Sequence, residues 1–184
     1  MEAKNFDERI ELPAGVVATY DEKTGVLAVT GPKGCVSKVI ADPRVAMGVT
    51  DGAVTFLTKK ATMREKKLLY AFVAHAKNLV RGATQGYTYT LKICSGHFPM
   101  AVSVKGDVFE IKNFIGEKVP RTLKLKQGAT VKVDGERVVV TGTDKEIVGQ
   151  TAADIEQLSR RPGFDTRIFQ DGIFIIDKDG KKVV

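Results

Sequence analysis

The sequence predicts an α+β protein built from two tandem copies of a small domain, each a twisted, mostly antiparallel sheet with one helix packed on it. Three observations lead to this prediction. Short strand patterns separated by turns fill most of the chain, only two stretches carry the apolar spacing of an amphipathic helix, and one hairpin pattern occurs twice. The length of 184 residues, 43% of them hydrophobic, suits one domain or two small ones.

Residues 10–31 and 123–142 repeat one order of features. Each has a leucine, a glycine three residues on, a β-prone strand, a turn, and a second strand that ends in Val-Thr-Gly. Each is later followed by one amphipathic helix. We therefore expect domains at residues 1–82 and 83–184. The matching positions are Leu12 and Leu125, Gly15 and Gly128, and residues 29–31 and 140–142.

The first helix is expected over about residues 62–81 and the second over about 145–160. Pro162-Gly163 ends the second helix because proline cannot continue it. Asp171-Gly172 then predicts a tight turn before residues 173–176, whose apolar run predicts a buried strand. The two apolar stripes are Leu69, Phe72, Val73, Ala76 and Val80, and Val148, Thr151, Ala152, Ile155 and Leu158.

The remaining segments fit around this frame. Residues 82–86 are the expected link between the domains, and NFIGEKVPR (113–121) is expected to form an apolar-tipped loop with basic flanks. GPKG (31–34) is interpreted as a turn after a hairpin rather than a phosphate-binding loop, since the spacing of a P-loop is missing. Residues 31–40 are expected to form a loop that leads into a strand, residues 53–58 and 87–93 a strand each, and residues 101–113 a hairpin.

The net charge of +7 is unevenly distributed. Residues 59–132 hold 15 basic and 4 acidic side chains, a net charge of +11. The segments before and after each hold two more acidic than basic side chains. A middle segment this basic favours a polyanionic partner, most plausibly nucleic acid, over a merely lysine-rich surface.

Targeting and catalytic signals are weak. The first residues lack the pattern of a signal peptide and no segment is apolar enough for a membrane span, so the cytoplasm is the expected location.

We expect no metal, cofactor or small-molecule substrate, and no enzymatic activity. Cys94 and His97 form the only thiol–imidazole proximity, but no third group orients the imidazole, and a buried structural cysteine is the preferred interpretation.

Arginines gather around the end of the second helix. Arg160, Arg161 and Arg167 flank the Pro162-Gly163 stop, and three lysines follow the last strand. The planar guanidinium group suits phosphate recognition. The alternative is a solvated helix end where cations are favourable. Spacing alone does not decide between the two.

Five motifs resemble the large-subunit ribosomal protein six family in its archaeal and eukaryotic form. They are GQTAADIEQLSRRPGFDTRIFQDGIFI (149–175), GPKG (31–34), the segment 64–93, HFPM (97–100) and NFIGEKVPR (113–121), in collinear order over nearly the whole chain. The resemblance implies a duplicated α+β fold. It also implies binding of large-subunit rRNA, mainly through the C-terminal domain, near the sarcin–ricin loop and the translation-factor site, beside neighbouring ribosomal proteins.

The candidate rRNA contacts combine this resemblance with the charge pattern. Phe164 departs from the basic residue that relatives carry, although an aromatic ring could stack on a base. An RNA-binding protein that works off the ribosome is the alternative function, and a small cysteine-dependent enzyme the more distant one. The candidate contacts are Arg160, Arg161, Arg167, Gln170, Asp171, Gln150, Gln157, Lys178, Lys112, Lys118, Arg121, Lys59, Lys60 and Arg64.

Overall fold

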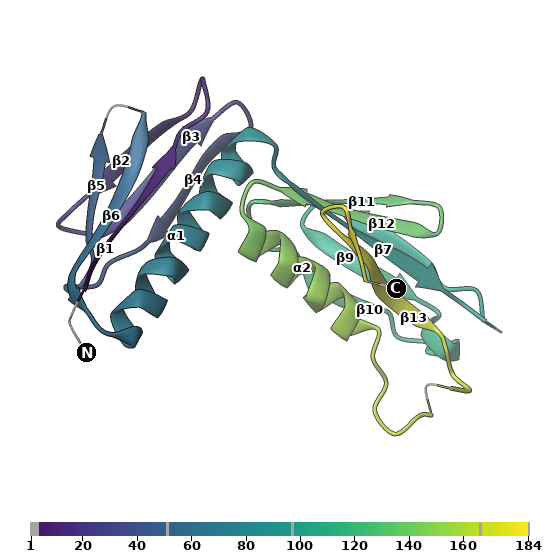
Figure 1. Cartoon of the computed structure of the whole chain (residues 1–184). Coiled ribbons are helices and arrows are strands. Elements are labelled where there is room, and N and C mark those ends of the chain that lie inside the picture. Colours follow the sequence, from purple (N-terminus) through teal and green to yellow (C-terminus); the bar gives the residue numbers. More distant parts are fainter. Residues whose placement is uncertain (1–3, 51, 97, 166, 184) are drawn as a thin grey trace. The chain divides into compact units, whose positions relative to one another are not determined.

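The computed structural model describes residues 4–50, 52–96, 98–165 and 167–183 (Figure 1). The chain divides into two compact units, residues 1–86 and 87–184. The boundary expected after residue 82 falls inside the first helix, which continues to Thr84. The division lies four residues later, because the Gly-Ala-Thr that was interpreted as a link is the last turn of that helix.

The first unit consists of two three-stranded antiparallel sheets, ordered β1-β6-β5 and β2-β3-β4, with helix α1 packed on both (Figure 1). Leu27, Phe56 and Leu69 are fully buried between the sheets and the helix. The elements are β1 (Lys4–Glu11), β2 (Val17–Asp21), β3 (Val26–Gly31), β4 (Gly34–Val39), β5 (Ala46–Thr50), β6 (Ala53–Ala61) and α1 (Met63–Thr84).

Local sequence explains where α1 begins. Thr62 is its N-cap, and Glu65 completes a capping box by accepting a hydrogen bond from the Thr62 backbone N–H. The expected apolar stripe faces the sheets, with Leu69, Val73 and Ala76 buried. The stripe therefore fixes which face of the helix packs on the sheets.

The second unit has a five-stranded sheet, ordered β11-β12-β7-β13-β14, and a three-stranded sheet, ordered β10-β9-β8. Helix α2 packs mainly on β7, β12 and β13 and also contacts β10. The elements are β7 (Tyr87–Cys94), β8 (Ala101–Lys105), β9 (Val108–Lys112), the 3-10 turn η1 (Phe114–Gly116), β10 (Arg121–Lys124), β11 (Ala129–Asp134), β12 (Arg137–Gly142), α2 (Lys145–Leu158), β13 (Gly172–Lys178) and β14 (Lys181–Lys182).

The two units share one topology, as the fold class predicts. Strand β1 corresponds to β7, the meander β2-β3-β4 to β8-β9-β10, the hairpin β5-β6 to β11-β12, and α1 to α2. The alignment of residues 10–31 with 123–142 was nevertheless wrong, because it paired β2-β3 with β11-β12. In both units the hairpin that leads directly into the helix is the equivalent one.

Strand β13 differs from the fully buried strand that its apolar run predicted. Ile173 and Ile175 are buried in the core with Val148 and Ile155 of α2, whereas Phe174 between them is 44% exposed. The sheet has α2 on one face only, so the strand alternates between core and surface. No helix among the described residues is long and apolar enough to cross a membrane.

Candidate nucleic-acid interface

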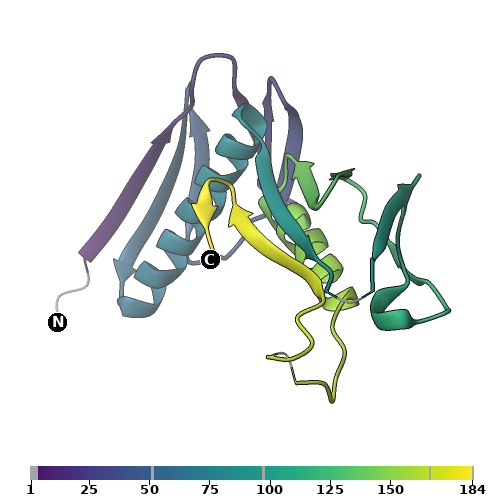
Figure 2. The same cartoon turned by 90° about the vertical axis from the view of Figure 1, so that its right-hand side faces the viewer.

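The candidate site is the connection between α2 and β13, residues 159–171, which extends beyond both elements in Figure 2. Ser159 ends α2 and is buried. Its hydroxyl donates to the Glu156 carbonyl over 2.9 Å and accepts from the Ile173 N–H over 2.9 Å. These two hydrogen bonds, one to the helix and one to the strand, fix both ends of the connection. Helix α2 ends at Leu158, before the Pro162-Gly163 stop.

Arg121 of β10 holds the connection from the other side. Its guanidinium group donates to both carboxylate oxygens of Glu117, over 2.6 and 2.7 Å, and to the carbonyls of Leu158 and Arg160, over 2.7 and 2.9 Å. It also lies 4.3 Å from the ring centre of Phe114. A cation that donates hydrogen bonds to the free carbonyls at the C-terminal end of a helix stabilises that end.

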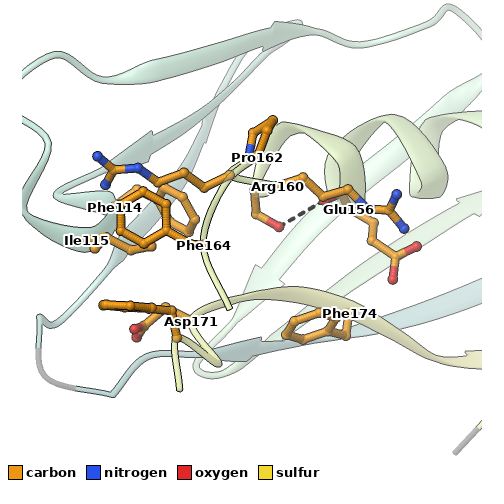
Figure 3. A pocket seen from close by; sticks show the side chains of 11 residues that line it. Phe114, Ile115, Glu156, Arg160, Pro162, Phe164, Asp171 and Phe174 are labelled. Atoms are coloured by element: carbon orange, nitrogen blue, oxygen red, sulfur yellow. Dashed lines mark hydrogen bonds between the residues drawn. The ribbon is translucent and has the colours of Figure 1, made fainter. Parts of the chain in front are cut away.

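The connection and the η1 loop enclose an apolar pocket of about 560 Å³. Phe114 and Phe164 lie on one side and Phe174 on the other, with Arg160 and Glu156 at the end of α2 (Figure 3). Phe164 and Phe169 meet edge to face at 4.9 Å between ring centres. The lining residues are Phe114, Ile115, Glu156, Ser159, Arg160, Arg161, Pro162, Phe164, Phe169, Asp171 and Phe174.

Two of the three predicted arginines line this pocket. Arg161 stacks on Phe164 at 4.2 Å and lies 3.9 Å from Glu117, while Arg160 extends from the end of α2. Arg167 is 88% exposed outside the lining and pairs with both oxygens of Asp165, the shorter contact being 2.7 Å. The hydrogen bonds from Arg167 lower the pKa of Asp165. Exposed pairs of this kind are weak and exchange readily for other anions.

Hydrogen bonds from Arg121 lower the pKa of Glu117, assisted by the charges of Arg121 and Arg161. Glu117 therefore stays ionised and connects two arginines of the site. The guanidinium group of Arg121 is engaged by Glu117, by two carbonyls and by the Phe114 ring, and its predicted rRNA contact stays a prediction. Its contacts in this structure are those of a residue that holds the loops together.

The other predicted residues of the second unit surround the site at varying distance. Gln170 donates to the Arg167 carbonyl, and Asp171 accepts a hydrogen bond from the Gly96 N–H. Gln150 bonds Asp154 on the surface of α2. The remaining exposed positions are Gln157 on α2, Lys178 at the end of β13, Lys112 at the end of β9 with Glu110 at 3.7 Å, and Lys118 in the loop after η1.

Lys59, Lys60 and Arg64 belong to the first unit, at the end of β6 and the start of α1. Lys59 and Arg64 are exposed, whereas the side chain of Lys60 lies outside the described part of the structure. The C-terminal arginines belong to the second unit.

Cys94 is only partly buried, which corrects the expectation of a buried thiol, because it is the last residue of β7. It lines a second cavity, of about 500 Å³, with Phe169 and Asp171. His97 lies outside the described residues, so its distance from Cys94 is not tested. Among the described residues, no group of three or more His, Cys, Asp or Glu side chains could hold a metal ion.

Sequence reasoning missed the aromatic lining and the residues that support it. Phe114 and Phe169 were taken as parts of loops, and Ser159 and Glu117 were not singled out. One signal in the sequence could have indicated the pocket. Several phenylalanines lie in segments that turn residues mark as loops, and large apolar side chains in loops need a partner surface.

Comparison with known proteins identifies the family. The sequence profile described as "Ribosomal protein L6" matches residues 98–172, which include both loops of the pocket. The chain is 41% identical over 174 residues to the "Large ribosomal subunit protein uL6" of Methanococcus vannielii, covering 95% of this chain and 94% of that protein. It is 42% identical over 168 residues to the protein of the same name from Natronomonas pharaonis, covering 91% and 94%. The chain therefore belongs to the ribosomal protein uL6 family.

Proposed function

We propose that this chain, a ribosomal protein of the large subunit, binds large-subunit rRNA mainly through its second unit, near the sarcin–ricin loop and the translation-factor site. That the chain is a protein of the large ribosomal subunit follows from the family, whose members are structural ribosomal proteins and not enzymes. The cytoplasmic ribosome is accordingly its location, with rRNA and neighbouring ribosomal proteins as partners. Nearby translation factors are part of the proposal.

One observation supports rRNA binding through the second unit. The connection between α2 and β13 displays Arg160, Arg161 and Arg167 on a segment whose two ends are fixed by Ser159 and Arg121. Structured RNA is recognised largely through its shape, phosphates and 2′-hydroxyls. Preorganised arginines recognise such groups at a low entropic cost. We propose that Gln150, Gln157, Gln170, Asp171, Lys112, Lys118 and Lys178 border this contact, and that Lys59, Lys60 and Arg64 contact rRNA separately.

The test compares two triple variants with equal loss of charge. The site variant carries Arg160→Ala, Arg161→Ala and Arg167→Ala, and the control carries Lys124→Ala, Lys132→Ala and Arg137→Ala, which are exposed in the same unit. Affinity is measured for large subunits stripped of this protein, with thermal unfolding as the fold control. We expect the site variant alone to bind about 10- to 100-fold more weakly, because arginine–phosphate bonds are stronger than unspecific attraction.

Equal losses in both variants would mean that only net charge matters and would refute the proposed site. Mapping the rRNA nucleotides protected by the wild-type protein tests the location. Protection away from the sarcin–ricin loop would refute that part. The alternative, an RNA-binding protein that works off the ribosome, predicts that the chain leaves large subunits during a high-salt wash.

A further inference from the structure

We propose that the apolar pocket of the second unit receives one unstacked nucleobase of large-subunit rRNA, with Arg160 and Arg161 beside its phosphate. The inference rests on the proposed function and specifies what the site binds. Its first support is the lining itself, in which four phenylalanine rings surround about 560 Å³. A volume in this range suits a small-molecule-sized guest such as a nucleotide.

Three of these rings are substantially exposed. Phe164, Phe169 and Phe174 are 37%, 40% and 44% exposed, although all three lie within a small part of the surface. Clustered apolar exposure of this kind marks a binding surface. Aromatic rings bind nucleobases by stacking, which contributes to affinity for every base because every base has a π-face.

The pocket is held open by contacts behind its walls. Arg121 stacks behind the buried Phe114, and Arg161 stacks on Phe164. A Cβ at Gly172 would lie 2.9 Å from the ring of Phe174, so only glycine lets that ring lie where it does. Ile115 has φ +48°, in the left-handed region that β-branched residues avoid. Such strain persists where surrounding contacts enforce it, and it is concentrated at binding sites.

The polar groups at the rim match a nucleotide better than an apolar peptide. Arg160 has no ion pair with any described residue, and the one ion pair of Arg161 with a described residue is the 3.9 Å contact with Glu117. Both guanidinium groups can therefore donate to a phosphate. The carboxylates of Glu156 and Asp171 also line the pocket. A carboxylate accepts hydrogen bonds from the amino group of a base. A purely apolar guest would offer no hydrogen-bonding group to these four charged side chains.

The test uses the full-length chain bound to large subunits stripped of this protein. The pocket variant carries Phe164→Leu and Phe169→Leu, which keep apolar bulk but remove the rings. The control is Ile168→Ala, a residue 73% exposed in the same connection and outside the pocket lining. Two readouts are compared, the affinity for the stripped subunits and the chemical reactivity of each rRNA base.

We expect the leucine variant to bind about 3- to 30-fold more weakly, somewhat less than the loss per base seen when an aromatic residue is replaced by alanine. One nucleotide that the wild-type protein and Ile168→Ala protect should become reactive in the leucine variant. Unchanged affinity together with an unchanged reactivity pattern would overturn the inference.

Ultraviolet irradiation of wild-type subunits provides a test without any substitution. It should crosslink a pocket phenylalanine to one rRNA nucleotide, and a crosslink to a neighbouring protein instead would overturn the inference. Failure of the proposed function can be distinguished from failure of this inference. If the proposed function fails, the triple arginine variant and its lysine and arginine control bind stripped subunits equally well, whatever the pocket variant does.

Discussion

Removing the Arg121 side chain should destabilise the second unit although the residue lies on a surface strand. In Arg121→Ala, the carboxylate of Glu117 loses two hydrogen bonds, and the carbonyls of Leu158 and Arg160 lose their donor. Both charged side chains are mostly buried, with Arg121 22% and Glu117 27% exposed. Their interaction is therefore only partly screened by water.

The magnitude follows from these contacts. A hydrogen bond to a charged group contributes about 1.5–3 kcal/mol, and breaking a fully buried ion pair costs about 3–5 kcal/mol. Partial exposure and the access of water to the freed carbonyls reduce the sum, so we expect a loss of about 2–4 kcal/mol. For a unit of this size, that corresponds to a fall in Tm of roughly 10–25 °C.

The assay is urea and thermal unfolding of the full chain, with Lys118→Ala as the matched control. Lys118 is an exposed cation in the loop just before β10, so its loss should change the free energy of unfolding by less than about 0.5 kcal/mol. Arg121→Lys keeps the charge but cannot reach Glu117 and both carbonyls together, and should fall between the two. A loss below about 1 kcal/mol in Arg121→Ala would refute the role of Arg121 in holding the loops together.

Three further outcomes are expected. The affinity of the chain for rRNA should fall with salt at a log–log slope of about −3 to −5, given roughly 4–6 phosphate contacts, and a slope near zero would reject the electrostatic interpretation. Cys94→Ser should leave subunit assembly intact and change the free energy of unfolding by less than about 1 kcal/mol, because the thiol is partly exposed. A folded, fully incorporated variant that lost function would instead support the enzyme alternative. The pKa of Glu117 is lowered from the ordinary 4.5, so its ionisation stabilises the fold above that pH, and this stabilisation is lost as pH falls through the lowered pKa. The Tm difference between wild type and Glu117→Gln should therefore shrink on acidification. A Tm difference independent of pH would contradict this.

The fold class could be predicted because its signals are local. Apolar spacing located both helices, and glycines with turn residues located most strands. The register of the duplication could not be obtained in this way. Gly15 and Gly128 both have positive φ, at +81° and +92°, so their similar surroundings reflect the needs of a turn rather than equivalent positions in the fold. The informative signal was the hairpin followed at once by a helix.

The candidate site was predictable only in part for a related reason. The arginines were visible because charge and sequence proximity are properties of the chain. Arg121 bonds carbonyls 37 and 39 residues away, and no local pattern encodes that contact. The pocket has the same origin, since its walls come from two loops that only the packed sheet and α2 bring together.

The duplication shows why the site belongs to the second unit. Strand β1 is an edge strand of its sheet in the described chain, whereas its equivalent β7 is paired on that side by β13. The sequence of β1, KNFDERIE, places charged residues along this edge, and charges discourage further strands from pairing there. Strand β7 carries the apolar alternation YTYTLKIC and accepts β13. Adding β13 requires a connection from the end of α2 to the sheet edge, and that connection carries the arginines and two of the pocket phenylalanines. The proposed binding surface is therefore the part of the second copy that the first copy does not have.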